Sequence, residues 1–296
     1  MQPFLRWAGG KRKLADLITA CIPRQVTENP EFNFFEPFVG GGAVMLHLGE
    51  PENSNFVPGS RLHINDMNPD LVLAYLSIQN QVVELMDLLN LLSQDLSKDA
   101  YLKIRSEVPE GNLERAARFI YLNKTGFNGL WRVNNKGLYN VPWGQLKSPT
   151  LYNHDTLMAI SKRLQGAEIT FTDYRDALKK VKRDDLVYLD PPYIPLNVSS
   201  SFSKYAKDDF TLENQNELSN QISELSEKSA AVILSNSDTP ETREIFGEKM
   251  YLFQIDASRA ISANASSRGT VKEIIAVNFE LDLSKEVLRN KIVRVN

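Results

Sequence analysis

Short hydrophobic runs and segments of helical periodicity alternate along most of the chain. An apolar run of roughly four to eight residues that is closed by Gly, Pro or polar residues is typical of a buried strand. Seven segments have this form: residues 32–38, 61–66, 168–173, 185–190, 230–237, 251–255 and 274–279. Apolar residues recur at helical spacing over residues 69–96, as one helix or two, and over residues 98–124. The alternation predicts an α/β fold with a mostly parallel, doubly wound, Rossmann-like sheet.

Polar residues follow several of the predicted strands. Three strands end on an aspartate, Asp66, Asp173 or Asp190, and the first strand runs into a glycine loop after Val39. Ligands of doubly wound sheets collect beyond the carboxyl ends of the strands, so these residues describe one polar rim. Aspartate is also a common helix cap, which gives each of the three a purely structural interpretation.

The glycine loop indicates a nucleotide-like ligand. The glycines at 40–42 let the backbone approach a ligand closely, and the helix that follows points unpaired amides into the same space. A dinucleotide is disfavoured, because Met45 stands where the G-x-G-x-x-G fingerprint has its third glycine. Asp66 either accepts hydrogen bonds from ribose hydroxyls or caps the helix at Pro69. Residues 7–11, WAGGK, predict a turn that places an aromatic ring and a cation beside the ligand. The structural alternatives are a tight strand-to-helix turn for the glycine loop and ordinary N-terminal capping of the domain for residues 7–11.

Residues 127–144 differ in character from the rest of the chain. They are rich in Gly, Asn and aromatic residues, and the pair at 136–137, Lys-Gly, suits the tip of a β-hairpin. Residues 114–147 contain six basic residues and one acidic residue, although the formal net charge of the whole chain is −3. The negative net charge argues against binding of nucleic acid over the whole surface of the protein. A polyanion responds to the local distribution of charge, however, and the basic segment could bind it. A solvated basic face is the plain alternative.

The composition restricts the class of protein. With 296 residues and 42% hydrophobic content, the chain can form one large α/β domain or a core with a smaller insertion. Cys21 is the only cysteine, and the histidines His47, His63 and His154 suggest no shared site, so we expect no disulfide and no metal. There is no apolar run of membrane-spanning length and no signal-peptide core, so we expect a soluble, cytoplasmic protein.

Residues 190–193, Asp-Pro-Pro-Tyr, close a hydrophobic strand in a way that folding alone does not explain. The exocyclic amine of an aromatic base is a poor nucleophile, because its lone pair is delocalised into the ring, and a site that uses it must aim that lone pair at an electrophile. The Asp190 carboxylate and the Pro191 carbonyl can accept the two amine hydrogens, while Pro191 and Pro192 fix the backbone. Tyr193 offers a ring face on which a base stacks.

Eight sequence blocks, in one fixed order, span nearly the whole chain. They are RWAGGK (6–11), EPFVGGG (36–42), IND (64–66), NGLWRVN (128–134), YNVPWG (139–144), DPPYIPL (190–196), LSNS (234–237) and SSRG (266–269). In this order they resemble the Dam-type DNA adenine methyltransferases, the D12 class or alpha group. Among these the sequence is most similar to the GATC-modifying enzymes of restriction systems.

The resemblance implies S-adenosylmethionine as the methyl donor and double-stranded DNA as the substrate. It implies that the cofactor lies near Trp7, Lys11, Phe38, Gly40, Gly42, Asp66, Asp173 and Asp190. It implies a catalytic role for Asp190, Pro191, Pro192 and Tyr193. Carried over residue by residue, it assigns DNA contacts to Arg6, Phe127, Asn128, Leu130, Arg132 and Pro142. Phe127 matches the position that wedges into the base stack, and Asn128 matches its neighbour at the vacated site.

We therefore expect two parts. Residues 1–68 and 150–296 are predicted to form the S-adenosylmethionine-dependent catalytic domain, and residues 69–149 a mainly helical DNA-recognition domain with a hairpin at about 127–144. The expected reaction is methylation of the exocyclic amino nitrogen of adenine in duplex DNA after base flipping. The target sequence expected from the resemblance is GATC, although the wedge and hairpin-tip positions vary across the family. We expect a monomer on DNA, with a cognate restriction endonuclease only as a genetic neighbour.

Other functions are compatible with parts of this pattern. The cytosine 4-amino group has similar chemistry, although SPPY is commoner in enzymes that modify it. An RNA or a protein glutamine could be the substrate, where NPPY would be expected. A DNA-binding module on an inactive methyltransferase core is a further alternative, against which the intact Asp190, Tyr193 and glycine loop argue.

Overall fold

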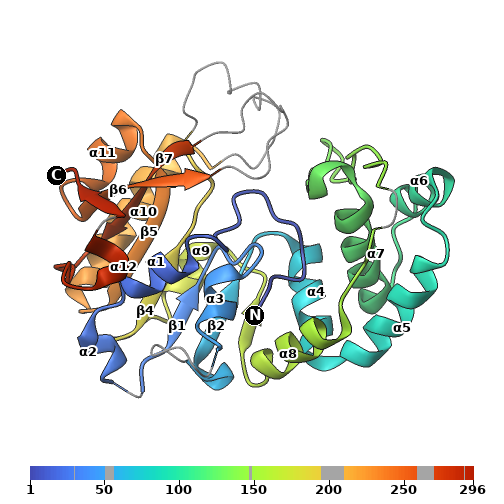
Figure 1. The fold of residues 1–296 in the computed structure, drawn as a ribbon, viewed down its shortest axis with the longest axis horizontal. Coiled ribbons are helices and arrows are strands. Elements are labelled where there is room, and N and C mark those ends of the chain that lie inside the picture. The colour runs from blue at the N-terminus through green and yellow to red at the C-terminus, as the bar shows by residue number, and fades with distance from the viewer. Residues whose placement is uncertain (30, 51–56, 147–148, 195–209, 259–269, 290) are drawn as a thin grey trace.

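An eight-stranded mixed sheet forms the centre of the protein (Figure 1). The structure is a computed structural model that describes residues 1–29, 31–50, 57–146, 149–194, 210–258, 270–289 and 291–296. The strand order is β3-β2-β1-β4-β5-β7-β6-β8. The strands are β1 (Phe34–Glu36), β2 (Leu62–Asn65), β3 (Glu168–Thr170), β4 (Leu186–Leu189), β5 (Ala231–Ser237), β6 (Tyr251–Ser258), β7 (Thr270–Val277) and β8 (Ile292–Arg294). The first five run parallel, whereas β7, β6 and β8 each pair antiparallel with a neighbour.

Helices cover both faces of the sheet. In chain order they are α1 (Ala15–Ala20), α2 (Arg24–Thr27), α3 (Ala43–His47), α4 (Pro69–Asn80), α5 (Val82–Ser93), α6 (Lys98–Ser106), α7 (Asn112–Thr125), α8 (His154–Leu164), α9 (Tyr174–Leu178), α10 (Leu212–Glu227), α11 (Pro240–Phe246) and α12 (Glu286–Arg289). Two short 3-10 turns, η1 (Gly59–Arg61) and η2 (Phe127–Gly129), complete the described elements. Figure 1 shows α4 to α8 gathered on one side of the sheet.

Side chains of the central strands alternate between two hydrophobic cores. Leu186 and Tyr188 of β4 belong to the core shared with α1, α3, α4, α5, α7 and α8, whereas Val187 and Leu189 belong to the core under α9, α10 and α11. A strand buried on both faces reads as a continuous apolar run, which is why β4 was recognisable in the sequence. The first core also contains Tyr101 and residues of α7, so the helices at 69–125 share a core with the sheet.

A buried carboxylate sets β4 beside β1. Asp185 is only 2% exposed, and it accepts hydrogen bonds from the Asn33 amide at 2.8 Å, the Asn33 carboxamide at 3.0 Å and the Lys182 amide at 2.8 Å. The two strands then start in register, with Phe34 opposite Leu186. Because both strands run in the same direction, the loops that follow them emerge at the same edge of the sheet.

The structure agrees with the predicted fold class and refines its elements. All seven predicted strands are present, and the segment of helical periodicity at residues 69–96 forms two helices that meet at Gln81. Strand β8 was not predicted, because Val293 and Arg294 are exposed and leave only Ile292 buried. The expected hairpin is held by two isolated bridges rather than by a regular ladder. Among the described helices, none combines the length and apolar character needed to cross a bilayer.

Candidate active site

The glycine loop after β1 has a backbone that other residues would strain. Gly40 and Gly42 have φ angles of +45° and +65°, in the left-handed region. A Cβ atom at Gly40 would lie 2.7 Å from Nε1 of Trp7, and one at Gly42 would lie 2.6 Å from the Tyr75 hydroxyl. The Tyr75 hydroxyl also donates to the Gly40 carbonyl at 2.9 Å. The loop is therefore packed tightly between the N-terminal segment and α4.

Asp66 is tied to the glycine loop and does not cap the following helix. It accepts hydrogen bonds from the Gly40 amide at 3.0 Å and from the Asn68 amide at 2.9 Å. The cap of α4 is Asn68, whose side chain accepts from the amides of Asp70 and Leu71. Of the two interpretations of Asp66, the helix cap is therefore wrong. Burial raises the pKa of the Asp66 carboxyl, and the amide bonds oppose that rise.

Two further residues predicted near the cofactor lie beside α9. Asp173 caps that helix, with its side chain accepting from the Arg175 amide at 2.9 Å. Phe38 follows β1 and packs against Tyr174 and Phe210, with ring centroids 5.2 and 5.7 Å apart. Phe38 and Asp173 thus approach α9 from the loops that follow β1 and β3, two strands on either side of β2.

Lys11 reaches from the N-terminal segment to the acid of the Asp-Pro-Pro-Tyr corner. Its Nζ lies 2.9 Å from Oδ1 of Asp190 and 4.7 Å from the centroid of the Tyr193 ring. The Lys11 side chain is 6% exposed and that of Asp190 is 21% exposed. Burial raises the pKa of Asp190, and the Lys11 ammonium acts in the opposite direction. A cation, a carboxylate and an aromatic ring therefore meet where a base amine was predicted to sit.

Polar side chains of β5 and α10 brace the corner. Gln215 donates to the Pro192 carbonyl at 2.8 Å, and the Asn236 carboxamide accepts from the Ile194 amide at 3.3 Å. Asn236 in turn donates to Gln215 at 3.2 Å. Within the described part of the chain, no group donates to the carbonyl of Pro191. The carbonyl predicted to accept an amine hydrogen thus has no donor in this part of the chain, although Pro191 itself is buried, whereas its neighbour at Pro192 is already bonded.

Two buried glutamates flank the corner. Glu273 of β7 accepts a hydrogen bond from the Tyr193 hydroxyl at 3.1 Å, which fixes the direction of the ring. Glu36 of β1 is 2% exposed and accepts from the Met45 amide of α3 at 3.1 Å. Burial, and next the nearby Asp190 charge, raise the pKa of Glu36 well above its ordinary value. Sequence reasoning missed the role of both glutamates, although Glu36 belongs to the quoted EPFVGGG block.

The residues predicted to contact DNA fall into one surface on the helical side. The Phe127 amide donates to the Pro142 carbonyl at 2.9 Å, which joins the start of the hairpin to its return. Phe127 is 40% exposed, Arg132 and Pro142 are exposed, and Leu130 is partly buried. Asn128 has a φ angle of 55°, a strained left-handed turn within η2.

Arg6 belongs to the same surface, although it comes from the other end of the sequence. Its backbone is bonded to Asn123 of α7, and a Cβ atom at Gly129 would collide with the Arg6 side chain. Arg132 is held by its Nε, which donates to Oδ1 of Asn140 at 2.7 Å. That bond leaves both terminal nitrogens of the Arg132 guanidinium for a ligand. The Asn140 contact was not foreseen.

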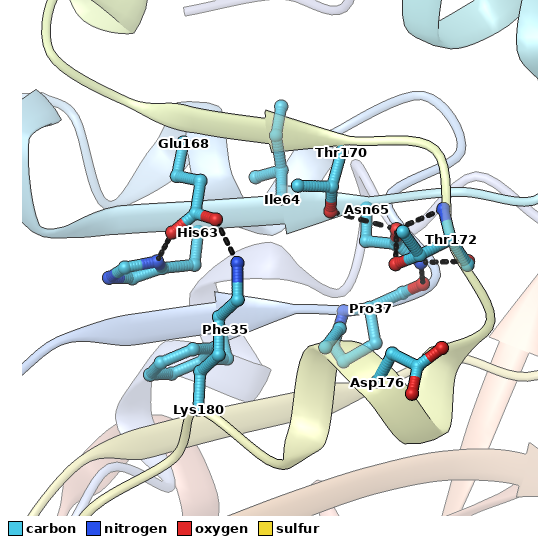
Figure 2. Close-up of a pocket in the computed structure, with 11 residues that line it drawn as sticks. Phe35, Pro37, His63, Ile64, Asn65, Glu168, Thr170, Thr172, Asp176 and Lys180 are labelled. Carbon is cyan, nitrogen blue, oxygen red and sulfur yellow. Dashed lines mark hydrogen bonds and ion pairs between the residues drawn. The ribbon is translucent and has the colours of Figure 1, made fainter.

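The pocket in Figure 2 lies elsewhere, between β1 to β3 and α9. His63 stacks on Phe35 with centroids 4.3 Å apart, and its Nδ1 lies 2.9 Å from Glu168. Lys180 pairs with the other oxygen of Glu168. None of the predicted site residues lines this pocket; His63 and Lys180 both pair with Glu168 there, and Asp176 pairs with Lys179. The candidate reacting groups therefore remain those of the Asp190 corner, namely its carboxylate, the Pro191 carbonyl and the Tyr193 ring.

Comparison with known proteins decides the family. Residues 7–261 match the family model described as D12 class N6 adenine-specific DNA methyltransferase. The chain belongs to this family. It is 35% identical over 287 residues to a type II methyltransferase of Lactococcus lactis subsp. cremoris, covering 94% of this chain and 96% of the relative.

Two other relatives have names of the same kind. A DNA adenine methylase of Haemophilus influenzae is 34% identical over 282 residues, 93% of each chain. A type II methyltransferase of Methanocaldococcus jannaschii is 33% identical over 292 residues, 94% of this chain and 99% of the relative. The predicted resemblance is thus confirmed, and the protein is an adenine-specific DNA methyltransferase. The cytosine, RNA and protein alternatives have no support from these relatives.

Parts of the predicted site lie outside the described residues. The DPPYIPL block is described only as far as Ile194, the SSRG block at 266–269 not at all, and Lys147 of the basic segment is also outside. Among the described residues no group of His, Cys, Asp and Glu could hold a metal ion.

Replacing Lys11 with Met should shift the acid limb of the pH–rate profile for DNA methylation to higher pH. The Lys11 ammonium lowers the pKa of Asp190, so its loss lets burial raise that pKa further and protonates the acceptor at a higher pH. The measurement is kcat/KM against pH. As a control, Lys98→Met at the exposed start of α6 should leave the profile in place; an unmoved acid limb in Lys11→Met would contradict the prediction.

The effects of Tyr193→Phe and Glu273→Leu on kcat should be coupled. Each change removes the same 3.1 Å hydrogen bond, so their effects on kcat should be non-additive by about 0.5–3 kcal/mol in a double-mutant cycle. Tyr152→Phe, which loses an exposed bond to Asn90, should instead be additive with Glu273→Leu. Additive effects in both cycles would show that Glu273 does not fix the orientation of the Tyr193 ring.

Proposed function

We propose that the protein transfers a methyl group from S-adenosylmethionine to the exocyclic amino nitrogen of adenine in duplex DNA, within GATC, after flipping the base. The observation that carries the proposal is the corner after β4. There the Asp190 carboxylate, paired with Lys11, and the Pro191 carbonyl, which has no donor among the described residues, lie at the same edge of the sheet as the glycine loop. Family membership supplies the reaction on adenine. The donor, the target sequence and flipping are our proposal.

The carboxyl edge of β1 to β3 fits an adenosine-containing donor. Asp66 uses its carboxylate oxygens for two amides, but each oxygen has a second lone pair, so ribose hydroxyls can still be accepted. Met67 and Phe171, 59% and 51% exposed, follow the neighbouring strands β2 and β3 and offer apolar surface for a base. Phe38 adds a ring on the next loop. When bound, S-adenosylmethionine would supply a methyl carbon on a positively charged sulfur, which takes up the electron pair as the amine attacks.

The chain's own residues orient the amine. The Asp190 carboxylate and the Pro191 carbonyl accept its two hydrogens, and this directs the lone pair away from the ring plane toward the methyl. Tyr193, fixed by Glu273, stacks on the flipped base. Lys11, 2.9 Å from Asp190, lowers the pKa of that carboxyl against the effect of burial and so favours the ionised form that accepts from the amine. The proton lost on methylation leaves to solvent, so no strong base is needed.

The surface formed by Arg6, η2 and the hairpin is suited to reading DNA. Exposed Phe127 can wedge between base pairs, and the strained turn at Asn128 projects from the same place. Arg132, with Nε already bonded to Asn140, presents its terminal nitrogens for a bidentate grip on guanine. Leu130 and Pro142 offer apolar contacts for a thymine methyl. We propose that residues 69–149 serve recognition and the remainder catalysis.

The biological setting follows from this proposal. The protein acts as a monomer on double-stranded DNA, in the cytoplasm, and a restriction endonuclease is related to it only as a genetic neighbour. The two names found among its relatives, type II methyltransferase and DNA adenine methylase, are compatible with either a restriction system or an independent methylase.

Asp190→Ala should abolish methyl transfer and leave binding of S-adenosylmethionine and DNA measurable. The change removes an acceptor that acts on the amine, while the glycine loop and the hairpin are untouched. Labelled S-adenosylmethionine with GATC duplexes, and with duplexes changed at one base, measures transfer. Label on cytosine, or none with the unaltered protein, would contradict the proposed function. Fluorescence of 2-aminopurine at the target position measures flipping.

Arg132→Ala should relax discrimination at one base of the target, with a loss of about 1–3 kcal/mol there. Lys136→Ala, at the exposed hairpin tip, should weaken all duplexes alike and reduce the salt dependence of binding. The measurement is kcat/KM on GATC and on its single-base variants. A uniform loss from Arg132→Ala would show that this side chain does not read a base.

A further inference from the structure

A buried asparagine at the end of α7 holds the N-terminal segment against the hairpin. Asn123 is 0% exposed. Its Oδ1 accepts from the Arg6 amide at 2.9 Å, and its Nδ2 donates to the carbonyls of Arg6 at 2.7 Å and of Gly129 at 2.9 Å. One carboxamide thus satisfies both backbone groups of Arg6 and ties them to η2.

The geometry requires a carboxamide. The site presents one amide donor and two carbonyl acceptors, and Asn offers one acceptor oxygen and two donor hydrogens. Aspartate at this position would face the two carbonyls with a second oxygen. Leucine would leave three buried backbone groups without their partner.

The segment held by Asn123 continues directly into the reacting site. Trp7 packs on the glycine loop, and Lys11 pairs with Asp190 at 2.9 Å. On the other side, Gly129 belongs to the turn that presents Phe127. The same carboxamide therefore lies between the groups that meet DNA and the groups that meet the reacting amine.

We propose that Asn123 is a positioning residue that links recognition of the target sequence to catalysis. It sets the position of Arg6 relative to the hairpin, and through the same short segment the position of Trp7 and Lys11. A duplex that fits Arg6 and the hairpin together then completes the reacting site, and one that misfits disturbs it. The inference rests on the proposed reading of DNA by this surface.

Asn123→Asp should lower the discrimination ratio, kcat/KM on GATC over kcat/KM on single-base variants, by about 5- to 30-fold. The loss should be mainly in kcat on the cognate duplex rather than in KM for that duplex. The matched control is Thr125→Val on the same helix end. Thr125 is equally buried and donates to the Tyr121 carbonyl at 2.6 Å, and no bond joins its side chain to Arg6 among the described residues. The control should keep the wild-type ratio.

A second variant tests the same contact from the other side if Asn123→Asp fails to fold. Gly129 has a φ angle of +66°, and a Cβ atom there would press on the Arg6 side chain, so Gly129→Ala should reduce the ratio in the same direction. An unchanged discrimination ratio in Asn123→Asp would overturn the inference, and if that variant does not fold, an unchanged ratio in Gly129→Ala would do so. A loss of the ratio in Thr125→Val as large as that in Asn123→Asp would also overturn it. If the wild-type protein shows no methylation or no discrimination, the proposed function fails instead.

Discussion

The parallel pairing of β1 with β4 is the constraint on which the site depends. The two strands come from distant parts of the chain, with 152 positions between Asn33 and Asp185, yet the buried Asp185 carboxylate holds their starts together. Their carboxyl ends then lie side by side at the point where the strand order reverses. The glycine loop and the Asp-Pro-Pro-Tyr corner meet there as a consequence of register, before any ligand is considered.

That meeting brings acids together in a place from which water is largely excluded. Asp190 lies near the buried Glu36, and burial raises the pKa of both carboxyls. A carboxylate in such a site is maintained by a counter-charge, and Lys11 supplies it from the opposite end of the sequence. The N-terminal segment is therefore an electrostatic part of the site. Because the same segment carries Arg6, the counter-charge is also joined to the surface of η2 and the hairpin, for which we propose DNA contacts.

The sequence predicted what depends on local pattern and missed what depends on long-range contacts. A buried strand such as β4 can be recognised in the sequence from its continuous apolar run. The Asp-Pro-Pro-Tyr corner can be recognised as well, because its four residues are consecutive. The braces on that corner, Gln215, Asn236 and Glu273, lie on α10, β5 and β7, and only the fold brings them to it. Asp66 shows how far the role of a single residue can be predicted. The side chains of Asp66 and Asn68 both precede α4 and could both accept its amide hydrogens, and only the structure shows that Asn68 caps the helix.

The hairpin depends on the rest of the protein for its shape. Two isolated bridges and a few backbone hydrogen bonds, such as that from the Asn140 amide to the Arg132 carbonyl at 3.0 Å, join its arms without a regular ladder, and a lone hairpin of this kind is marginally stable at best in water. Buried hydroxyls supply the remaining support: Tyr101 donates to the Val141 carbonyl at 2.8 Å, and Tyr139 donates to the carbonyls of Leu122 and Leu130 at 3.2 Å. These tyrosines belong to the core that reaches the catalytic sheet. The core beneath the hairpin therefore sets the position of the hairpin relative to the Asp190 corner, and the surface that we propose reads DNA does not fold as a separate unit.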